Sequence, residues 1–248
     1  MLRKTLTDHL DFMAQQNKRS LRPFVDRLAA ALRATGEHRV VDLCSGGGGP
    51  SPVITRLLRE EHGLPARVTL TDLYPNLERF ERAGRLEGEM INFCSEPVDA
   101  TTVPRTLEGF RLLCNSFHHM PPDLARQILS DAVDRGVGIA VLEFVERSPI
   151  GLMQVLLGVL LMPLVAPIIQ PFSLRRLLLT TIVPVAPLSA LWDGMVSCLR
   201  IYSPDELREL TAGLDGYAWD IGRLRIPPTP LHLTYLIGVP GSAARAAS

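Results

Sequence analysis

Residues 40–50, which read VVDLCSGGGGP, join a short apolar run, one acid and four consecutive glycines. Glycine loses more conformational freedom on folding than any other residue, so such a run is costly unless bare backbone is needed. Other reactive residues also follow apolar runs: Asp72 in TLTDLYP, Asp99 in EPVDATTVP, and His118 and His119 in CNSFHHMPP. In an open parallel sheet, ligands bind beyond the carboxyl ends of the strands. The glycine loop therefore predicts a bound small molecule.

The spacing of the loop separates three kinds of ligand. A phosphate-binding P-loop needs G-x-x-x-x-G-K-[ST], and no lysine follows these glycines. A dinucleotide fingerprint wants a third glycine three residues after the second, and counting from Gly46 and Gly48 that position is Ser51. A third pattern, with an acid inside the first strand (Asp42) and glycines two residues apart, fits better.

With these residues in place, VVDLCSGGGG resembles the first motif of the class I S-adenosylmethionine-dependent methyltransferases, in which hydrophobic residues and an acid precede G-x-G-x-G. The three glycine positions fall on Cys44, Gly46 and Gly48, so a cysteine replaces the first glycine. This departure makes the turn bulkier where the methionine part of the cofactor would lie.

Three further markers follow in family order over residues 38 to about 146. Asp72 matches the acid that ends the second strand and takes the two ribose hydroxyls, and Asp99 with Ala100 matches the pair that meets adenine. CNSFHHMPP is similar to the fourth motif, which lies beside the methyl group. The resemblance thus implies S-adenosylmethionine as cofactor, held by Asp42, Cys44, Gly46, Gly48, Asp72, Leu73, Asp99, Ala100, Asn115 and Ser116.

The candidate catalytic residues are His118, His119 and Glu143. Methyl transfer is an in-line displacement, and alignment supplies most of its acceleration. A base is required only where the acceptor must lose a proton, and histidine titrates in the suitable range. Glu143 ends the fifth predicted strand and competes for this role. No metal is needed for this chemistry.

Arg200 and Tyr202 are the candidate substrate-binding residues. They precede Ser203, Pro204 and Glu206, a proline-started helix with the spacing of a capping box. We expect this helix to border the mouth of the pocket, where an arginine could hold a substrate carboxylate through two hydrogen bonds.

Composition limits the partners of the protein. The 26 basic and 26 acidic residues of the 248 cancel, which does not fit a nucleic-acid binder. The four cysteines show no metal-ligand spacing and fit free thiols in a reducing compartment. The charged start MLRKTLTDHLDF lacks the apolar core of a secretion signal, so we expect a cytoplasmic protein.

The order of elements predicts an α/β fold. The strand candidates HRVVDLC, ARVTLTDL, MINFCSEPV, FRLLCNS and IAVLEFVE alternate with amphipathic stretches, which indicates right-handed βαβ units. YAWDIGRLRI and LHLTYLIGV are close enough to pair antiparallel. We expect a Rossmann-like parallel sheet with an antiparallel last strand, seven strands in all by the resemblance. The predicted parts are an N-terminal helical cap (1–36), the core (37–147 and 201–240) and a helical apolar insert after strand five (148–200).

The apolar insert goes beyond a minimal methyltransferase core. Spanning a membrane takes about 20 uninterrupted apolar residues, and Pro163, Pro167 and Pro171 interrupt the first apolar run. We expect a helical lid over an apolar pocket or a homodimer interface. The alternative is a segment that dips into the membrane surface to fetch a lipophilic acceptor.

The expected function is methyl transfer to O, N or C of a small, partly apolar molecule. Alternatives remain, because the motifs bind the cofactor without choosing which sulfonium carbon is attacked. One is cyclisation or aminocarboxypropyl transfer, which releases methylthioadenosine where methyl transfer would release S-adenosylhomocysteine. A second is a non-catalytic, cofactor-binding scaffold. A third, weaker one is a dinucleotide oxidoreductase.

Overall fold

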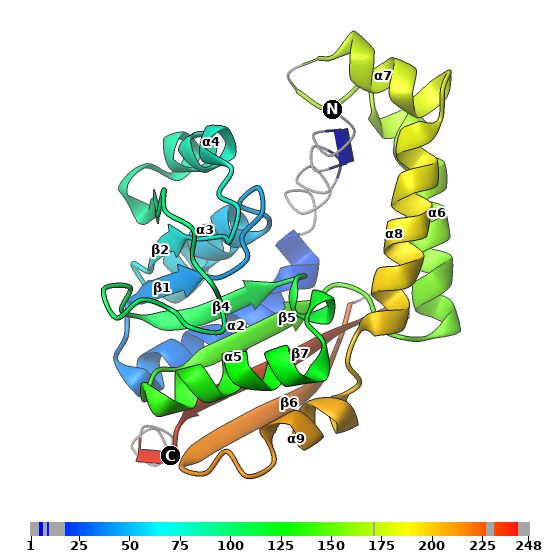
Figure 1. Ribbon diagram of the computed structural model, residues 1–248. Coiled ribbons are helices and arrows are strands. Elements are labelled where there is room, and N and C mark those ends of the chain that lie inside the picture. The colour runs from blue at the N-terminus through cyan, green and yellow to red at the C-terminus, as the bar shows by residue number, and fades with distance from the viewer. Residues whose placement is uncertain (1–4, 7–8, 10–17, 171, 227–230, 243–248) are drawn as a thin grey trace.

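A seven-stranded sheet in the order β3-β2-β1-β4-β5-β7-β6 forms the centre of the computed structural model (Figure 1). The structure describes residues 5–6, 9, 18–170, 172–226 and 231–242. The strands are β1 (Arg39–Asp42), β2 (Arg67–Leu70), β3 (Ile91–Phe93), β4 (Phe110–Cys114), β5 (Ile139–Glu143), β6 (Tyr217–Arg225) and β7 (His232–Pro240). Strands β1 to β5 are parallel, and β7 pairs antiparallel with both β5 and β6. The predicted fold class and the antiparallel last strand are confirmed.

Helices cover both faces of the sheet. The helices of the core are α2 (Lys18–Thr35), α3 (Ser51–His62), α4 (Leu77–Glu87), α5 (Pro122–Asp134) and α9 (Pro204–Thr211), with short 3₁₀ turns η1 (Gly88–Met90) and η2 (Phe117–His119). Leu28 of α2 and Leu58 of α3 are buried in one apolar layer, and Leu129 of α5 and Leu207 of α9 in the other. Because both faces are covered, every residue of β5 is buried, as a central parallel strand requires.

Two helix ends carry the capping residues that the sequence predicts. Helix α2 ends before Gly36, which takes the left-handed φ of +67° that suits glycine, so this part of the predicted N-terminal helical segment is confirmed. Most of residues 1–17 lie outside the described part of the chain. The capping box of α9 is present, because the Ser203 side chain accepts from the Glu206 N–H and the Glu206 side chain accepts from the Ser203 N–H.

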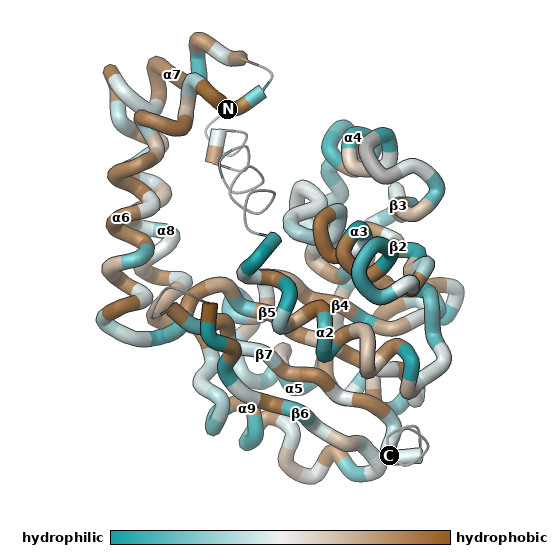
Figure 2. The backbone as a smooth tube through the Cα atoms, turned by 180° about the vertical axis from the view of Figure 1, so that it is seen from behind, coloured by the Kyte–Doolittle hydropathy of each residue, from teal (hydrophilic) through white to brown (hydrophobic). Residues whose placement is uncertain are grey.

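The apolar insert is an arm of three helices, α6 (Pro149–Val165), α7 (Leu174–Thr181) and α8 (Val185–Arg200), called the hairpin below. Helices α6 and α8 lie side by side and project from the core, with α7 at the tip, and Figure 2 shows their apolar colouring. At its base, α8 packs against η2. Near its tip, Arg82 of α4 donates to the carbonyl oxygen of Gln170 over 3.2 Å. The hairpin therefore stands beside the carboxyl ends of the strands.

Candidate cofactor and catalytic site

The glycine turn between β1 and α3 uses backbone angles that favour glycine. The φ angles of Gly46, Gly48 and Gly49 are +60°, +96° and +45°, in the left-handed region. A side chain on Gly48 would also touch Ala83 and Leu70 of neighbouring elements at 3.5 and 3.6 Å. The run of glycines is thus explained by its turn, which leads directly into the start of α3.

Cys44, which replaces the family's first glycine, also has a positive φ of +57°. L-residues with a side chain pay for this conformation, because the Cβ atom crowds the next carbonyl group. Burial, followed by the charge of Asp72, raises the pKa of the Cys44 thiol to about 12. Cys44 is therefore a strained, neutral residue of the turn and not a reactive nucleophile.

Asp42 ends β1 as a buried acid with one unpartnered oxygen. Its Oδ2 atom accepts a hydrogen bond of 2.6 Å from the Ser51 hydroxyl, whereas Oδ1 has no partner among the described residues. Burial raises the pKa of Asp42 to about 7 against the opposing effect of Ser51. A carboxyl group in this position gains most from a cationic partner. Ser51 was not among the predicted site residues, although its place at the start of α3 could have indicated it.

Asp72 joins the loop after β2 to the glycine turn. Its Oδ2 atom accepts from the Gly46 N–H over 2.8 Å, and Oδ1 accepts from the Tyr74 N–H over 2.8 Å. A carboxylate oxygen has capacity for a second hydrogen bond, so both oxygens can still meet a diol. Leu73 beside it is exposed. The structure thus brings Asp72 against the turn that follows Asp42.

The loop after β3 lies next to Asp72. The Val98 N–H donates to the Asp72 carbonyl oxygen over 2.9 Å, which brings Asp99 and Ala100 to the same edge. Asp99 accepts from the backbone N–H and the hydroxyl of Thr101 at 2.8 and 2.7 Å, so it caps its own turn. Ala100 is buried. Asp99 and Ala100, the predicted adenine-binding residues, thus lie near Asp72. The hydrogen bonds of Asp99, however, are those of a residue that caps its own loop.

Asn115 and Ser116 follow β4, the neighbour of β1. Asn115 has a φ of +53°, and its N–H donates to the Leu142 carbonyl oxygen over 2.7 Å. The buried hydroxyl of Ser116 has no partner among the described residues. Buried polar atoms are nearly always hydrogen-bonded. Two adjacent strands thus end near two buried oxygens that need partners, Asp42 Oδ1 and Ser116 Oγ.

His118 and Glu143 form a buried pair at the ends of β4 and β5. The distance from His118 Nδ1 to Glu143 Oε2 is 2.8 Å, and the His118 N–H donates to Glu143 Oε1 over 3.0 Å. Both side chains are at most 5% exposed. A carboxylate that accepts from Nδ1 fixes the ring and its tautomer. Glu143 therefore acts on His118, and the carboxylate is not free to serve as a separate base.

His119 lies between this pair and the hairpin. Its ring is tilted by 41° against that of His118, with centroids 4.2 Å apart, and it remains exposed. Desolvation, followed by the proximity of His118, lowers the pKa of His119, while Asp193 of α8 opposes the shift. His119 is therefore neutral at pH 7 and can accept a proton. Asp193 was not predicted as a neighbour, because sequence spacing does not show that α8 folds back on η2.

Tyr202 and Arg200 are at the base of the hairpin. The Tyr202 hydroxyl donates to the Met120 carbonyl oxygen over 2.7 Å, and its ring lies 5.6 Å from that of Phe117. These contacts anchor η2, so the Tyr202 hydroxyl is already engaged. Arg200 is exposed at the end of α8 and is near enough to influence His119.

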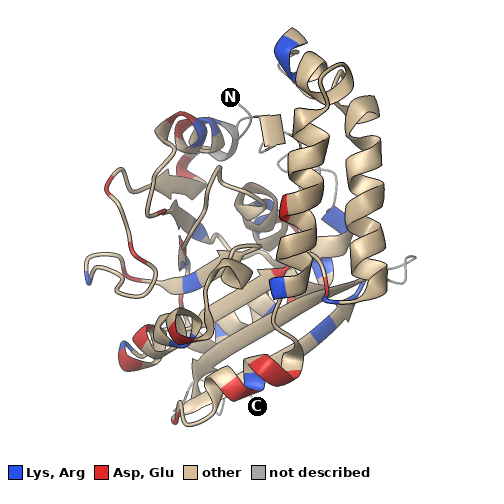
Figure 3. Cartoon of the chain, turned by 45° about the vertical axis from the view of Figure 1, so that its right-hand side comes forward, with Lys and Arg blue, Asp and Glu red and all other residues tan. Residues whose placement is uncertain are grey.

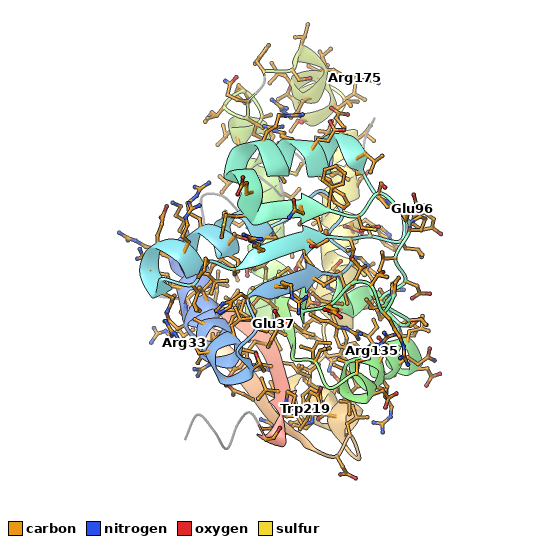
Figure 4. The ribbon with its side chains drawn as sticks, turned by 90° about the vertical axis from the view of Figure 1, so that its left-hand side faces the viewer. Arg33, Glu37, Glu96, Arg135, Arg175 and Trp219 are labelled. Atoms are coloured by element: carbon orange, nitrogen blue, oxygen red, sulfur yellow. The ribbon has the colours of Figure 1, made fainter. Side chains whose placement is uncertain are left out.

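No group of three or more His, Cys, Asp or Glu side chains among the described residues could hold a metal ion. A hollow of about 290 Å³ lies elsewhere, at the amino ends of β4 and β5, and is lined by Glu37, Gly109 and Gly138 among others. Figure 4 labels Glu37 near this end of the sheet and Glu96 in the loop at the carboxyl ends. The hollow is thus separate from the polar residues described above.

Comparison with known proteins supports the fold. No protein-family model and no curated protein matches the chain. An O-methyltransferase family protein from Burkholderia thailandensis superimposes with a TM-score of 0.50 at 16% identity, over 92% of this chain and 58% of that one. The S-adenosylmethionine-dependent methyltransferase SibL scores 0.47 at 17% identity (89% and 55%), and human N-acetylserotonin methyltransferase in complex with S-adenosylmethionine scores 0.47 at 16% (88% and 55%). The chain spans a little over half the length of these proteins. At these identities the likeness shows the fold alone.

Proposed function

We propose that this chain, which has the fold of class I S-adenosylmethionine-dependent methyltransferases, binds that cofactor and transfers its methyl group to a small, partly apolar acceptor. The observation that carries the proposal is the pair of buried oxygens without partners, Asp42 Oδ1 and Ser116 Oγ, at the ends of β1 and β4. Both flank the glycine turn, on the side of the sheet where such folds bind ligands.

The residues present fit the polar groups of the cofactor. Asp42 suits the ammonium group, because a cation there would compensate a buried carboxyl group whose pKa is raised to about 7. The start of α3 suits the carboxylate because a helix N-terminus favours an anion, while the N–H groups of Gly46 and Gly48 already donate to Asp72 Oδ2 and to the Ser45 carbonyl oxygen. Asp72, held by two backbone N–H groups, is rigid enough to accept from two adjacent hydroxyls. Cys44 adds bulk to this turn without adding charge.

The bound cofactor would supply an electrophilic methyl group on a sulfonium centre. The chain's part is to align the acceptor and, for an O or N acceptor, to remove its proton. His119 is the proposed base, since it is exposed, neutral at pH 7 and next to the hairpin. His118 is a positioning residue: Glu143 orients its ring, and the His119 ring packs against it at a tilt.

The first test is ligand binding and product analysis with the purified chain. We expect S-adenosylhomocysteine to bind in preference to NAD, and Asp72→Asn to weaken its binding more than tenfold, while Asp99→Asn has a smaller effect because Asp99 caps its own turn. Turnover should release S-adenosylhomocysteine. Release of methylthioadenosine would support non-methyl chemistry instead, and cofactor binding without turnover across varied acceptors would support a scaffold.

A second test separates the two histidines. For an O or N acceptor, His119→Ala should lower kcat by about 10²- to 10⁴-fold, the usual contribution of a general base, and leave cofactor affinity unchanged. Glu143→Gln should lower kcat less and shift the pH profile, because it only changes the orientation of His118. Equal kcat values for His119→Ala and the unaltered chain would exclude His119 as the base.

A further inference from the structure

The hairpin carries most of the exposed apolar surface of the described chain. Of the 23 large hydrophobic side chains recorded there as exposed, 18 belong to residues 149–200. The remaining five are Leu73, Tyr74, Leu77, Phe93 and Leu124. A soluble monomer rarely gathers so much apolar surface in one place. The hairpin therefore needs an apolar partner.

The outward face of α6 is apolar along its whole length. Its exposed side chains at helical spacing are Ile150, Met153, Leu156, Leu157, Leu160, Leu161 and Leu164. Only Gly151 and Met162 of this helix are buried. A helix that is apolar all round belongs in an apolar environment, either a protein core or lipid.

Helix α8 presents a second apolar stripe. Leu188, Trp192, Met195 and Leu199 recur at spacings of three and four residues, and Trp192 is 74% exposed. The two helices meet where Gly194 of α8 approaches Val155 of α6. By helical geometry, both exposed stripes point away from that contact, so they lie on opposite flanks of the hairpin. One flat partner surface could cover only one of them.

The few charges of the hairpin have distinct positions. Between Ser148 and Trp192 the only charged residues of the sequence are Arg175 and Arg176. Arg176 is buried and donates to the carbonyl oxygens of Ala166 and Ile169 inside the tip. Arg175 is exposed, and Figure 4 shows it at the outer end of the molecule, beyond α4. Figure 3 shows the rest of the hairpin nearly free of charge, with arginine again at its base.

The exposed charges at both ends of the hairpin are thus arginines, Arg175 and Arg200. The one acid, Asp193, is close enough to influence His119 and so lies on the side of the site. An apolar body flanked by cationic ends matches a bilayer whose headgroups are anionic. A second copy packed hairpin to hairpin would instead bring the same arginine ends together, with Asp193 as the one acid of residues 149–200.

From these observations we propose that the hairpin docks into an anionic lipid surface. Among the described residues no single helix is long and apolar enough to cross a membrane, and α7 and α8 have that length only together, as a pair bent by 68°. Helix α6 has 17 residues, which is about 25 Å and falls short of a hydrocarbon core of about 30 Å. The hairpin would therefore lie along one leaflet, with Arg175 and Arg200 at the level of the headgroups and the apolar side chains of both flanks among the acyl chains. This proposal does not depend on the methyl transfer proposed above.

Vesicle flotation of the full chain tests the proposal. We expect the chain to float with vesicles of phosphatidylcholine and phosphatidylglycerol and more weakly with phosphatidylcholine alone. Leu160→Glu combined with Leu164→Glu should reduce the bound fraction roughly tenfold or more, since each leucine forfeits its burial in lipid. Both side chains are over 60% exposed, so the variant should fold, which a thermal melt would verify. Leu124→Glu on α5, also exposed, is the matched control and should float normally.

Trp192 provides a direct probe of insertion in a Trp219→Phe background. Its emission should shift to the blue and be quenched by brominated acyl chains when anionic vesicles are added. A chain that stays unbound with both vesicle types would overturn the proposal. So would equal flotation of the Leu160/Leu164 variant, or a stable dimer that buries Trp192, does not float, and becomes monomeric in that variant.

Discussion

At the scale of single residues, Cys44 shows how a local conformation can be at odds with the residue that adopts it. Its φ of +57° is one that glycine takes freely and a side chain takes at a cost of about 1–2 kcal/mol. Hydrogen bonds nevertheless hold this turn against the residue that follows β2. For example, the Ser45 N–H donates to the Thr71 carbonyl oxygen over 2.9 Å. The surrounding hydrogen bonds therefore impose the conformation on Cys44.

This leads to a prediction for two variants at position 44. Cys44→Gly should be more stable than Cys44→Ala by about 1 kcal/mol, because glycine relieves the left-handed strain and both variants lose the same thiol. Chemical denaturation of the two proteins measures the difference. Cys94 is the control, because its φ is not among the positive values found in the described residues. At this position Cys94→Gly should be less stable than Cys94→Ala. The same order at both positions would contradict the strain argument.

Asp42 leads to a prediction about pH. In the ligand-free chain its pKa is about 7, so the carboxyl group is protonated, and without charge, at pH 5.5. The ammonium group of S-adenosylhomocysteine needs the ionised form, so its affinity should rise as pH increases from 5.5 to 7, by up to about tenfold per unit. Calorimetry across this range measures the slope. Asp42→Asn should bind weakly without the rise, and Asp99→Asn should retain it. A flat profile in the unaltered chain would contradict the proposed contact.

Sequence reasoning could reach these positions but not their contacts. Asp42, Asp72 and the His118–His119 loop follow strands whose order the pattern of hydrophobic runs predicts, so their meeting at one edge was predictable. The Asp42–Ser51 bond and the His118–Glu143 pair depend on side-chain directions across adjacent strands. No spacing rule gives those directions, and the same holds for the Tyr202 hydroxyl, which donates to the Met120 carbonyl oxygen.

At the scale of elements, the strands are shorter than the apolar runs that predict them. The run MINFCSEPV predicts a third strand, yet β3 covers only Ile91–Phe93, and Cys94 makes one more bond to the Leu70 carbonyl oxygen before the chain turns. The following residues are drawn into the loop beside Asp72 by the Val98 N–H. Loop contacts at the site thus end the strand earlier than its hydrophobicity suggests.

The hairpin gives a prediction at this scale, from two glycines in its two long helices. A methyl group on Gly158 would meet open space, whereas one on Gly194 would come within 2.7 Å of Val155. Gly158→Ala should therefore stabilise α6 locally by about 0.5–1 kcal/mol. Gly194→Ala should not stabilise α8, because the new methyl group would clash with Val155. Hydrogen exchange of α6 and α8 amides measures both. Gly194→Ala with Val155→Ala should recover part of the loss, and equal protection in the two single variants would contradict close packing at Gly194.

At the scale of the whole molecule, the core and the hairpin divide two tasks. The core orders a polar edge from loops after β1, β2, β3 and β4, and the hairpin places a long apolar surface beside that edge. They meet at η2 and through the Arg82 hydrogen bond to Gln170. If His119 is the base, as proposed above, the acceptor would lie near α8, and a lipid-docked hairpin would favour acceptors that partition into membranes. The predicted cytoplasmic location would then mean the cytoplasmic side of a membrane.

This division predicts that variants of the two parts act independently. Asp72→Asn should weaken S-adenosylhomocysteine binding more than tenfold and leave vesicle flotation unchanged, because the Asp72 carboxylate accepts its hydrogen bonds from the glycine turn and its own loop, away from the hairpin. Leu160→Glu with Leu164→Glu should abolish flotation and change cofactor affinity by less than about twofold, as expected for distant sites without shared partners. Calorimetry and flotation on the same preparations measure both. If the hairpin variant also lost cofactor binding, the hairpin would be part of the cofactor site, and its exposed apolar surface would need another explanation.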